Sequence, residues 1–299
     1  MLDRKSFSAV LNYKILLFLL AIFLPVSVFC QDSPFYPNDP YFFYNATERP
    51  YFPGQWHLEN NAPSEITTYI NSLEKNMTMK NADVDANLKG AWDAGYTGKG
   101  VVIGIVDDGV EATQEDIKDN YSAKLSRSFL DGNISENQGP VLQKDNHGTS
   151  VAGVAAARGG NGIGGTGAAP YATIAGLRLL SGSQTDEDEF NAYMWGSGLI
   201  FDKNTGKYTI KSSPEIAIKN HSYGAKLPFV SEESIVLQSL AKTSANGVIH
   251  VFSAGNDRGT KNEDANKTIT NSHRDVINVA ALGSDGKYSD YSSYGASVF

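Results

Sequence analysis

Two short apolar runs, 101–106 and 248–253, constrain the fold more than any other feature of this 299-residue chain. Both lack the polar alternation of a half-exposed strand, and both stop abruptly, the first at Asp-Asp-Gly and the second at Ala-Gly-Asn. Such runs are typical of strands buried on both faces of a parallel sheet. Further strands are predicted over 172–180 and 215–221, and helices over 83–94, 147–157, 187–195 and 232–245. Because strands and helices alternate, we predict an α/β fold with a mostly parallel central sheet and helices on both faces.

The composition excludes several classes of function. The chain has 25 Lys and Arg residues against 33 Asp and Glu, a net charge of −8, and this balance argues against a nucleic-acid partner because phosphate binding needs a basic face. The one cysteine, Cys30, lies in an apolar N-terminal run, so the remainder has no thiol for a disulfide, a zinc–cysteine site or a catalytic cysteine. The five histidines show no HExxH spacing, which disfavours a zinc protease.

The N-terminus has the pattern of a secretory signal. Arg4, Lys5 and Lys14 precede an apolar run over 15–30 that contains a proline. This pattern predicts a signal peptide over 1–30 and a secreted or secretory-pathway protein, periplasmic or extracellular in a bacterium. The run is short for a membrane span, so we expect no transmembrane span in the mature chain. An uncleaved membrane anchor is the alternative.

Residues 31–55 are rich in Pro, Asn, Tyr and Phe and show no periodicity. This composition predicts an extended N-terminal arm that precedes the α/β domain.

Polar residues follow three of the predicted strands, where the ligand site of an open parallel sheet lies. Asp107 follows the first apolar run, residues 220–223 end the strand over 215–221, and Asn256 follows the last run, while His147 opens a predicted helix. An Asp can orient an imidazole, the imidazole can accept a proton from a nucleophile, and an amide can donate to an oxyanion. Taken singly, each of these residues also fits a turn, a helix cap or a structural role.

The residues around these positions form three motifs in a fixed order. They read Val-Ile-Gly-Ile-Val-Asp-Asp-Gly over 102–109, Asp-Asn-His-Gly-Thr-Ser over 145–150 and Val-Phe-Ser-Ala-Gly-Asn over 251–256. Together they resemble the subtilase family of serine endopeptidases, and Asp-Asp-Gly with Gln-Trp-His-Leu over 55–58 is most similar to its kexin/furin-type branch. The resemblance implies a subtilisin-like peptidase domain over 56–299. It also implies that Asp107 is the triad aspartate, His147 the general base and Asn256 the oxyanion donor.

The same resemblance implies a substrate-binding segment. Ser222, Tyr223 and Gly224 align with a strand that hydrogen-bonds the main chain of an extended polypeptide substrate, and a plain buried strand end is the alternative. Asp108 would favour a basic residue at the second subsite. The acidic walls with which furin-like enzymes recognise arginine are missing from 224–227, and Lys267 falls near the second wall position. We therefore expect a broad or apolar preference at the first subsite.

The nucleophile of the family lies in a Gly-Thr-Ser motif well after the Asn, and no such motif occurs over 257–299. The Gly-Thr-Ser over 148–150 belongs to the His motif. We expect this chain to be a truncated form of a complete serine endopeptidase, ending before the nucleophile and inactive as it stands. The alternative is a catalytically inactive homologue that binds extended peptides.

Family members commonly bind structural calcium, so the resemblance implies a calcium site. Its ligands would be the side chains of Asp116 and Asn161 and the carbonyl oxygens of Arg158, Ile163 and Gly165. A further family ligand, an Asp in the N-terminal arm, aligns with Arg49. A solvated acidic turn is the alternative for Asp116.

A different class of function is suggested by residues 162–167, which match the GxGxxG pattern of dinucleotide-binding enzymes. That pattern should follow a strand and open a helix. Here it follows a predicted helix and precedes a strand, so we expect a tight loop rather than a nucleotide site.

Overall fold

The computed structural model describes residues 34–45, 47–48, 54–60, 62–63, 65–70, 75–80, 84–136, 139–142, 144–224 and 234–298. The signal peptide predicted over 1–30 lies outside these residues. Within them, no helix combines the length and the apolar character needed to cross a bilayer.

The largest sheet in the described part of the chain has seven strands in the order β11-β10-β9-β3-β6-β4-β5. The strands are β3 (Val102–Asp107), β4 (Arg127–Leu130), β5 (Asn133–Glu136), β6 (Thr173–Arg178), β9 (Ile218–His221), β10 (Ile249–Ser253) and β11 (Val276–Val279). All neighbouring pairs are parallel except β4 and β5. The predicted α/β fold with a mostly parallel sheet is therefore confirmed.

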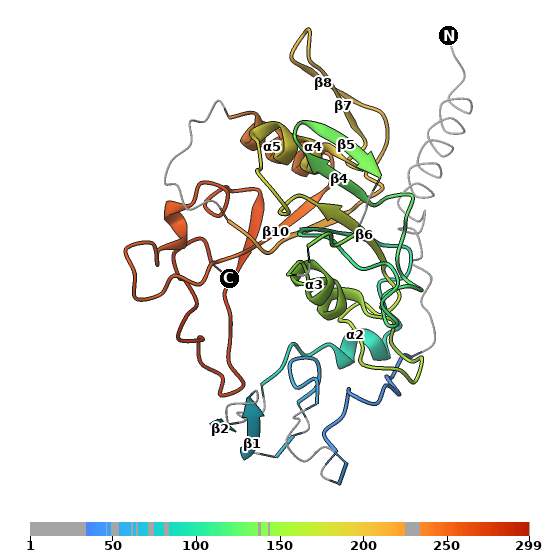
Figure 1. The fold of residues 1–299 in the computed structure, drawn as a ribbon, viewed down its shortest axis with the longest axis vertical. Coiled ribbons are helices and arrows are strands. Elements are labelled where there is room, and N and C mark those ends of the chain that lie inside the picture. The colour runs from blue at the N-terminus through green and yellow to red at the C-terminus, as the bar shows by residue number, and fades with distance from the viewer. Residues whose placement is uncertain are drawn as a thin grey trace, which may run out of the picture.

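Helices cover both faces of this sheet (Figure 1). The helix α3 (His147–Ala156) packs on one face, where Ala152 and Ala156 share a buried cluster with Ile105 of β3. The helices α4 (Asp186–Met194) and α5 (Ile235–Ala245) lie on the other face, where Tyr193 and Leu240 join a second buried cluster. The burial of both faces explains why the strands read as continuous apolar runs.

The helix predicted over 83–94 is much shorter. It spans only α2 (Lys89–Asp93), and Asp83, expected as its cap, lies outside the described residues. Asn87 has a positive φ of 53°, and its backbone N–H donates to the Asp85 carboxylate at 2.6 Å. This turn, typical of an Asx motif, occupies the positions where the first helical turn was expected.

Besides the strands β4, β5 and β11 of the central sheet, three smaller features were not predicted from the sequence. They are the hairpin of β1 (Glu65–Ile70) and β2 (Lys75–Lys80), the hairpin of β7 (Leu199–Asp202) and β8 (Lys207–Ile210), and the 3₁₀ turn η1 (Ala265–Lys267). The β7–β8 hairpin extends away from the central sheet (Figure 1). The strands of the two hairpins have only four or six residues and show little alternation of polar and apolar residues, so their periodic signal is too weak to be recognised.

The described part of the N-terminal arm packs against the domain. Phe35 and Phe42 are buried with Trp92 and Leu58, and the Phe35 ring meets the Trp92 ring edge-on at a centroid distance of 5.5 Å. The described residues of the arm form no strand or helix, and the arm builds a third apolar cluster together with residues of the domain.

Candidate active site

Asp107 and His147 are brought into direct contact. Asp107 ends β3, and its side chain is 0% exposed, while His147 is the first residue of α3 and its side chain is 57% exposed. The Nδ1 atom of His147 lies 2.9 Å from both carboxylate oxygens of Asp107. Because an ionised carboxylate only accepts hydrogen bonds, this contact places the proton on Nδ1 and leaves Nε2 free to accept one.

The next residue, Asp108, caps the helix that carries His147. Its Oδ1 atom accepts a hydrogen bond from the N–H of Gly148 at 2.7 Å, and its Oδ2 atom accepts one from the N–H of His147 at 3.1 Å. These are the first amides of α3, which have no partner within the helix, and the carboxylate also complements the helix dipole. Asp108 thus holds the start of α3 against the end of β3.

A glycine is required where the helix meets the strand. A Cβ atom on Gly148 would lie 2.4 Å from the carbonyl oxygen of Gly109 and 2.8 Å from the Cβ of Asp107. Either distance is a clash, so any side chain at Gly148 would push His147 away from Asp107. The close packing of the helix start against the strand end therefore explains the glycine in the His-Gly-Thr-Ser motif.

Two opposing effects act on the pKa of Asp107, and burial is the larger of them. Burial raises the pKa of the Asp107 carboxyl, because desolvation disfavours the charged form. The hydrogen bonds from His147 and from the N–H of Asp108 act in the opposite direction by stabilising the carboxylate. A buried carboxylate beside an exposed imidazole is an arrangement that stabilises a transient imidazolium.

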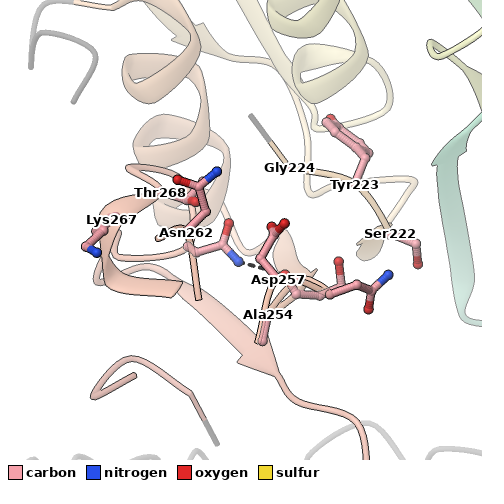
Figure 2. A pocket seen from close by; sticks show the side chains of 12 residues that line it. Ser222, Tyr223, Gly224, Ala254, Asp257, Asn262, Lys267 and Thr268 are labelled. Carbon is pink, nitrogen blue, oxygen red and sulfur yellow. Dashed lines mark hydrogen bonds between the residues drawn. The ribbon is translucent and has the colours of Figure 1, made fainter. Parts of the chain in front are cut away.

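Asn256 lies in the loop after β10, and its side chain is exposed. It lines a pocket of about 350 Å³ together with the substrate-binding residues predicted from the sequence, Ser222, Tyr223 and Gly224. Figure 2 shows this pocket between the segment that follows β9 and the loop over 254–257. The structure therefore gathers one predicted catalytic residue and three predicted binding residues around one cavity.

Strand register connects this pocket to the Asp107–His147 pair. Val106 of β3 pairs with His221 of β9, and His221 pairs in turn with Phe252 of β10. All three strands run parallel and end at the same edge of the sheet, so the residues that follow, Asp107, Ser222 and Ser253, emerge side by side. This is the edge at which ligands bind open α/β sheets.

Two of the other predicted calcium ligands, Asn161 and Gly165, lie against Asp116. The loop over 158–165 wraps the Asp116 side chain, whose Oδ2 atom accepts a hydrogen bond from the N–H of Gly165 at 3.0 Å, and the Asn161 amide side chain approaches the same carboxylate. The Oδ1 atom of Asp116 is buried and has no hydrogen-bond partner in the described part of the chain. Arg49 lies outside the described residues.

Asp39, a residue of the N-terminal arm that binds the loop over 158–165, was not identified from the sequence. Asp39 is 1% exposed, and its carboxylate accepts hydrogen bonds from three successive backbone amides, those of Gly160, Asn161 and Gly162, at 2.8 to 3.1 Å. The Asn-Pro-rich arm has no periodicity that would have marked Asp39. The loop joins α3 to β6, which is the reverse of the order that a dinucleotide site needs.

Comparison with known proteins identifies the class that this fold and site define. Residues 98–298 match the model of the peptidase S8 subtilase family. The chain therefore belongs to the subtilase family.

Its relatives confirm the resemblance to the kexin/furin-type branch. The chain is 34% identical to kexin of Saccharomyces cerevisiae over 249 residues, which cover 81% of this chain and 26% of that protein. It is 35% identical to furin of Homo sapiens over 147 residues, covering 49% of this chain and 16% of furin. The chain thus spans about a quarter of these relatives or less.

Solved structures agree on the fold. The serine protease of Aeromonas sobria matches with a TM-score of 0.56 and 26% identity, covering 72% of this chain and 38% of that chain. The proteases of Pseudoalteromonas arctica match with a TM-score of 0.63 and 24% identity, covering 88% of this chain and 70% of that chain, and support the fold alone.

Proposed function

We propose that this chain supplies the Asp–His pair and the oxyanion donor of a serine endopeptidase, and that the serine lies in sequence beyond Phe299. The observation that carries the proposal is the contact of 2.9 Å between His147 Nδ1 and the buried Asp107 carboxylate at the carboxyl edge of the sheet. Along the chain we assign a signal peptide to 1–30, an N-terminal arm to 31–55 and the peptidase domain to 56–299.

The chemistry follows from this pair. Asp107 holds Nδ1–H of His147, so Nε2 takes the proton of a serine hydroxyl as its oxygen attacks the carbonyl carbon of a peptide bond. The Asn256 side-chain N–H donates to the oxygen that becomes negative. The proton then passes from Nε2 to the leaving amine as the C–N bond breaks, and water hydrolyses the acyl-enzyme by the same route.

An uncovered apolar surface supports a continuation of the chain. Ile249, Ile277 and Val279 point to the sheet face that carries α3, yet they are 47%, 42% and 45% exposed. Contiguous apolar patches on sheet faces are normally covered. A further segment that carries the nucleophile and packs here would bury them beside the carboxyl edge.

The first prediction tests the function and the export together. The protein expressed from its complete reading frame is expected in the exported fraction and is expected to react with a fluorophosphonate probe. A His147→Ala variant is expected to lose the labelling, because the serine then has no base to accept its proton. Labelling is read by in-gel fluorescence, and melting curves show whether the variant is folded.

An inactive homologue that binds extended peptides is the second candidate, and the pocket lined by residues 222–224 is the feature that it would use. Extending the reading frame beyond Phe299 separates the two candidates. A Gly-Thr-Ser motif there favours the enzyme, whereas a substituted serine, or labelling that persists in His147→Ala, contradicts it.

We infer that the substrate is an extended polypeptide and that the pocket beside Asn256 receives the side chain next to the scissile bond. The charged residues that line it in the described part of the chain are Asp257 and Lys267, and Lys267 donates to the carbonyl of Lys261 at 3.0 Å. A pocket lined by one acidic and one basic side chain has no net negative charge that would favour an arginine side chain of the substrate. The Asp108 carboxylate already accepts hydrogen bonds from two backbone amides, so it is less available to bind a basic side chain of the substrate.

The second prediction concerns this pocket. A peptide-library profile of the complete protein is expected to show a broad preference at the first subsite, and Lys267→Asp is expected to raise the relative kcat/KM for arginine about tenfold by replacing a like charge with an opposite one. Lys261→Asp, the same change at an exposed lysine that does not line the pocket, is the control. A wild-type profile dominated by arginine would overturn the inference.

We propose that the loop over 158–165 binds a structural calcium ion. The residues fit a hard cation: the buried Oδ1 of Asp116 lacks a partner in the described part of the chain, and the Asn161 side chain approaches the same carboxylate group. The carbonyls of Arg158, Ile163 and Gly165 belong to the same loop, and Asp39 holds that loop in shape from the arm. The ion would neutralise the carboxylate and close the loop.

The third prediction follows. Calcium at about 100 times its dissociation constant is expected to stabilise the fold by about 2.7 kcal/mol, a rise of roughly 5–10 °C in melting temperature. The Asp116→Asn variant is expected to lose most of that rise, while Glu115→Gln, an exposed neighbour, keeps it. Equal melting temperatures with calcium and with a chelator would contradict the site.

A further inference from the structure

A buried polar network lies beneath the pocket segment 222–224. Tyr193 of α4 donates a hydrogen bond from its hydroxyl to the Oε1 atom of Glu189 at 2.6 Å. The Tyr223 hydroxyl lies 3.3 Å from the same Oε1 atom and 3.3 Å from the Tyr193 hydroxyl. One carboxylate of helix α4 thus gathers two tyrosines, one of them in the segment that lines the pocket.

Alternation along β9 separates the two sides of this segment. Lys219 and His221 are buried toward α4 and α5, and Tyr223 continues that row, while Ser222 is offset by one residue. Figure 2 shows the Tyr223 ring directed away from Ala254 and Asp257 across the pocket. The backbone over 222–224 therefore faces the cavity, and the Tyr223 side chain anchors it from below.

The network continues under the sheet. His221 Nδ1 lies 3.3 Å from the Tyr223 hydroxyl, and His221 Nε2 lies 2.9 Å from His250 Nδ1 on β10. The other nitrogen of His250 lies 2.9 Å from the Thr243 hydroxyl of α5. The segment is thus tied to both helices that cover this face.

Glu189 is the acidic member of this network. Its hydrogen-bond partners are Tyr193 on its own helix and Tyr223 after β9, and the charged group that acts on it is Asp186 at the start of α4. Further along the network, Lys219 acts on His221 and His250, His273 acts on His250, and Asp107 acts on Tyr223. The Glu189 carboxylate accepts from the Tyr193 hydroxyl and lies within reach of the Tyr223 hydroxyl, and removing a buried acceptor costs far more than a surface hydrogen bond contributes.

We propose that Glu189 is a positioning residue that acts through the Tyr223 hydroxyl to hold the pocket backbone over 222–224 in the conformation that pairs with a peptide. The proposal rests on the proposed function for the identity of the ligand. Glu189 itself does not contact the substrate. The affinity of the pocket for a peptide nevertheless depends on this side chain of α4.

The test compares four variants. Glu189→Ala removes the acceptor, Glu189→Gln keeps an oxygen acceptor, Tyr223→Phe removes the hydroxyl and keeps the ring, and Glu187→Ala changes an exposed carboxylate on the same helix. Hydrogen exchange of residues 218–224 is measured on each chain by mass spectrometry, and kcat and KM for a peptide substrate are measured on each complete protein.

Glu189→Ala and Tyr223→Phe are expected to speed exchange in this segment and to raise KM about tenfold with a smaller change in kcat, the size expected from losing one buried hydrogen bond to a charged group. Glu189→Gln and Glu187→Ala are expected to stay within about twofold of wild type in both measurements, a margin inside the usual scatter for surface or conservative changes.

Unchanged exchange and unchanged KM in Tyr223→Phe would overturn the proposal, and this variant decides the matter if Glu189→Ala fails to fold. A Glu189→Gln variant as impaired as Glu189→Ala would also overturn it, because Gln keeps the acceptor. A wild-type protein that cleaves no peptide would contradict the proposed function, and the exchange comparison, which needs no catalysis, would still decide the role of Glu189.

Discussion

Replacing Asp107 by Asn is expected to lower kcat of the complete protein by about 10⁴ at neutral pH. The Asn amide can donate to His147 Nδ1, which then accepts and leaves the proton on Nε2, the wrong nitrogen for a base. The loss of the buried charge also removes the partner of the imidazolium. Steady-state kinetics on a peptide substrate measure the effect, and Asp119→Asn, an exposed acid after the same strand, serves as the control.

The same substitution is expected to leave the free energy of unfolding unchanged or to raise it. Burial lifts the pKa of Asp107 above its unfolded value, so this group stabilises the fold below the unfolded pKa and loses that contribution as pH rises through the folded pKa. At neutral pH the ionised carboxylate is therefore a cost that Asn does not carry. A variant that lost activity only because it unfolded would contradict the catalytic role of Asp107.

Replacing Lys219 by Ala is expected to lower the free energy of unfolding by about 3–5 kcal/mol. The Lys219 side chain is fully buried on β9, and its Nζ atom donates to the carbonyls of Ala192, Tyr193 and Trp195 at 2.9, 2.5 and 2.7 Å. These carbonyls form the C-terminus of α4, where they lack partners within the helix and where a cation is favoured. Without the amine they are left buried and unpaired.

Chemical denaturation measures this loss, with Lys118→Ala as an exposed control and Lys219→Met as a variant that keeps most of the volume. Burial lowers the pKa of Lys219 from 10.5 to about 7. Between these values the unfolded chain binds more protons than the folded one, so this residue makes stability rise with pH, and Lys219→Met should lack that rise. If Lys219→Ala and Lys118→Ala lowered the free energy of unfolding equally, the role of Lys219 as a cap of α4 would be contradicted.

Much of the active-site pairing could be predicted because its parts are local motifs. The apolar run before Asp107 predicts a buried parallel strand, and a strand of this kind ends at the ligand edge of the sheet. His147 followed by Gly148 and Thr149 predicts a helix start, and the close approach at Gly148 accounts for the glycine. The loop over 158–165, to which four of the five proposed calcium ligands belong, could be recognised because its Gly-rich stretch can turn tightly.

Other contacts could not be predicted, because they join residues distant in sequence that no periodic pattern relates. Asp39 reaches the loop at Gly160 from the arm, more than a hundred residues away. Glu189 meets Tyr223 only because α4 packs over the end of β9. Asp108, expected to contact substrate, is occupied by the first amides of α3.

The sequence by itself determined the α/β class, the order of the motifs and the membership in the subtilase family, since these depend on residue type and on periodicity along the chain. Only the tertiary structure decided which partner each polar side chain has. The arm binds the glycine-rich loop, the amine of Lys219 binds the end of α4, and the tyrosine under the pocket meets the carboxylate of α4. The physical reason is that strand and helix periods fix which face of an element is buried, whereas the packing of elements against one another fixes what that face meets.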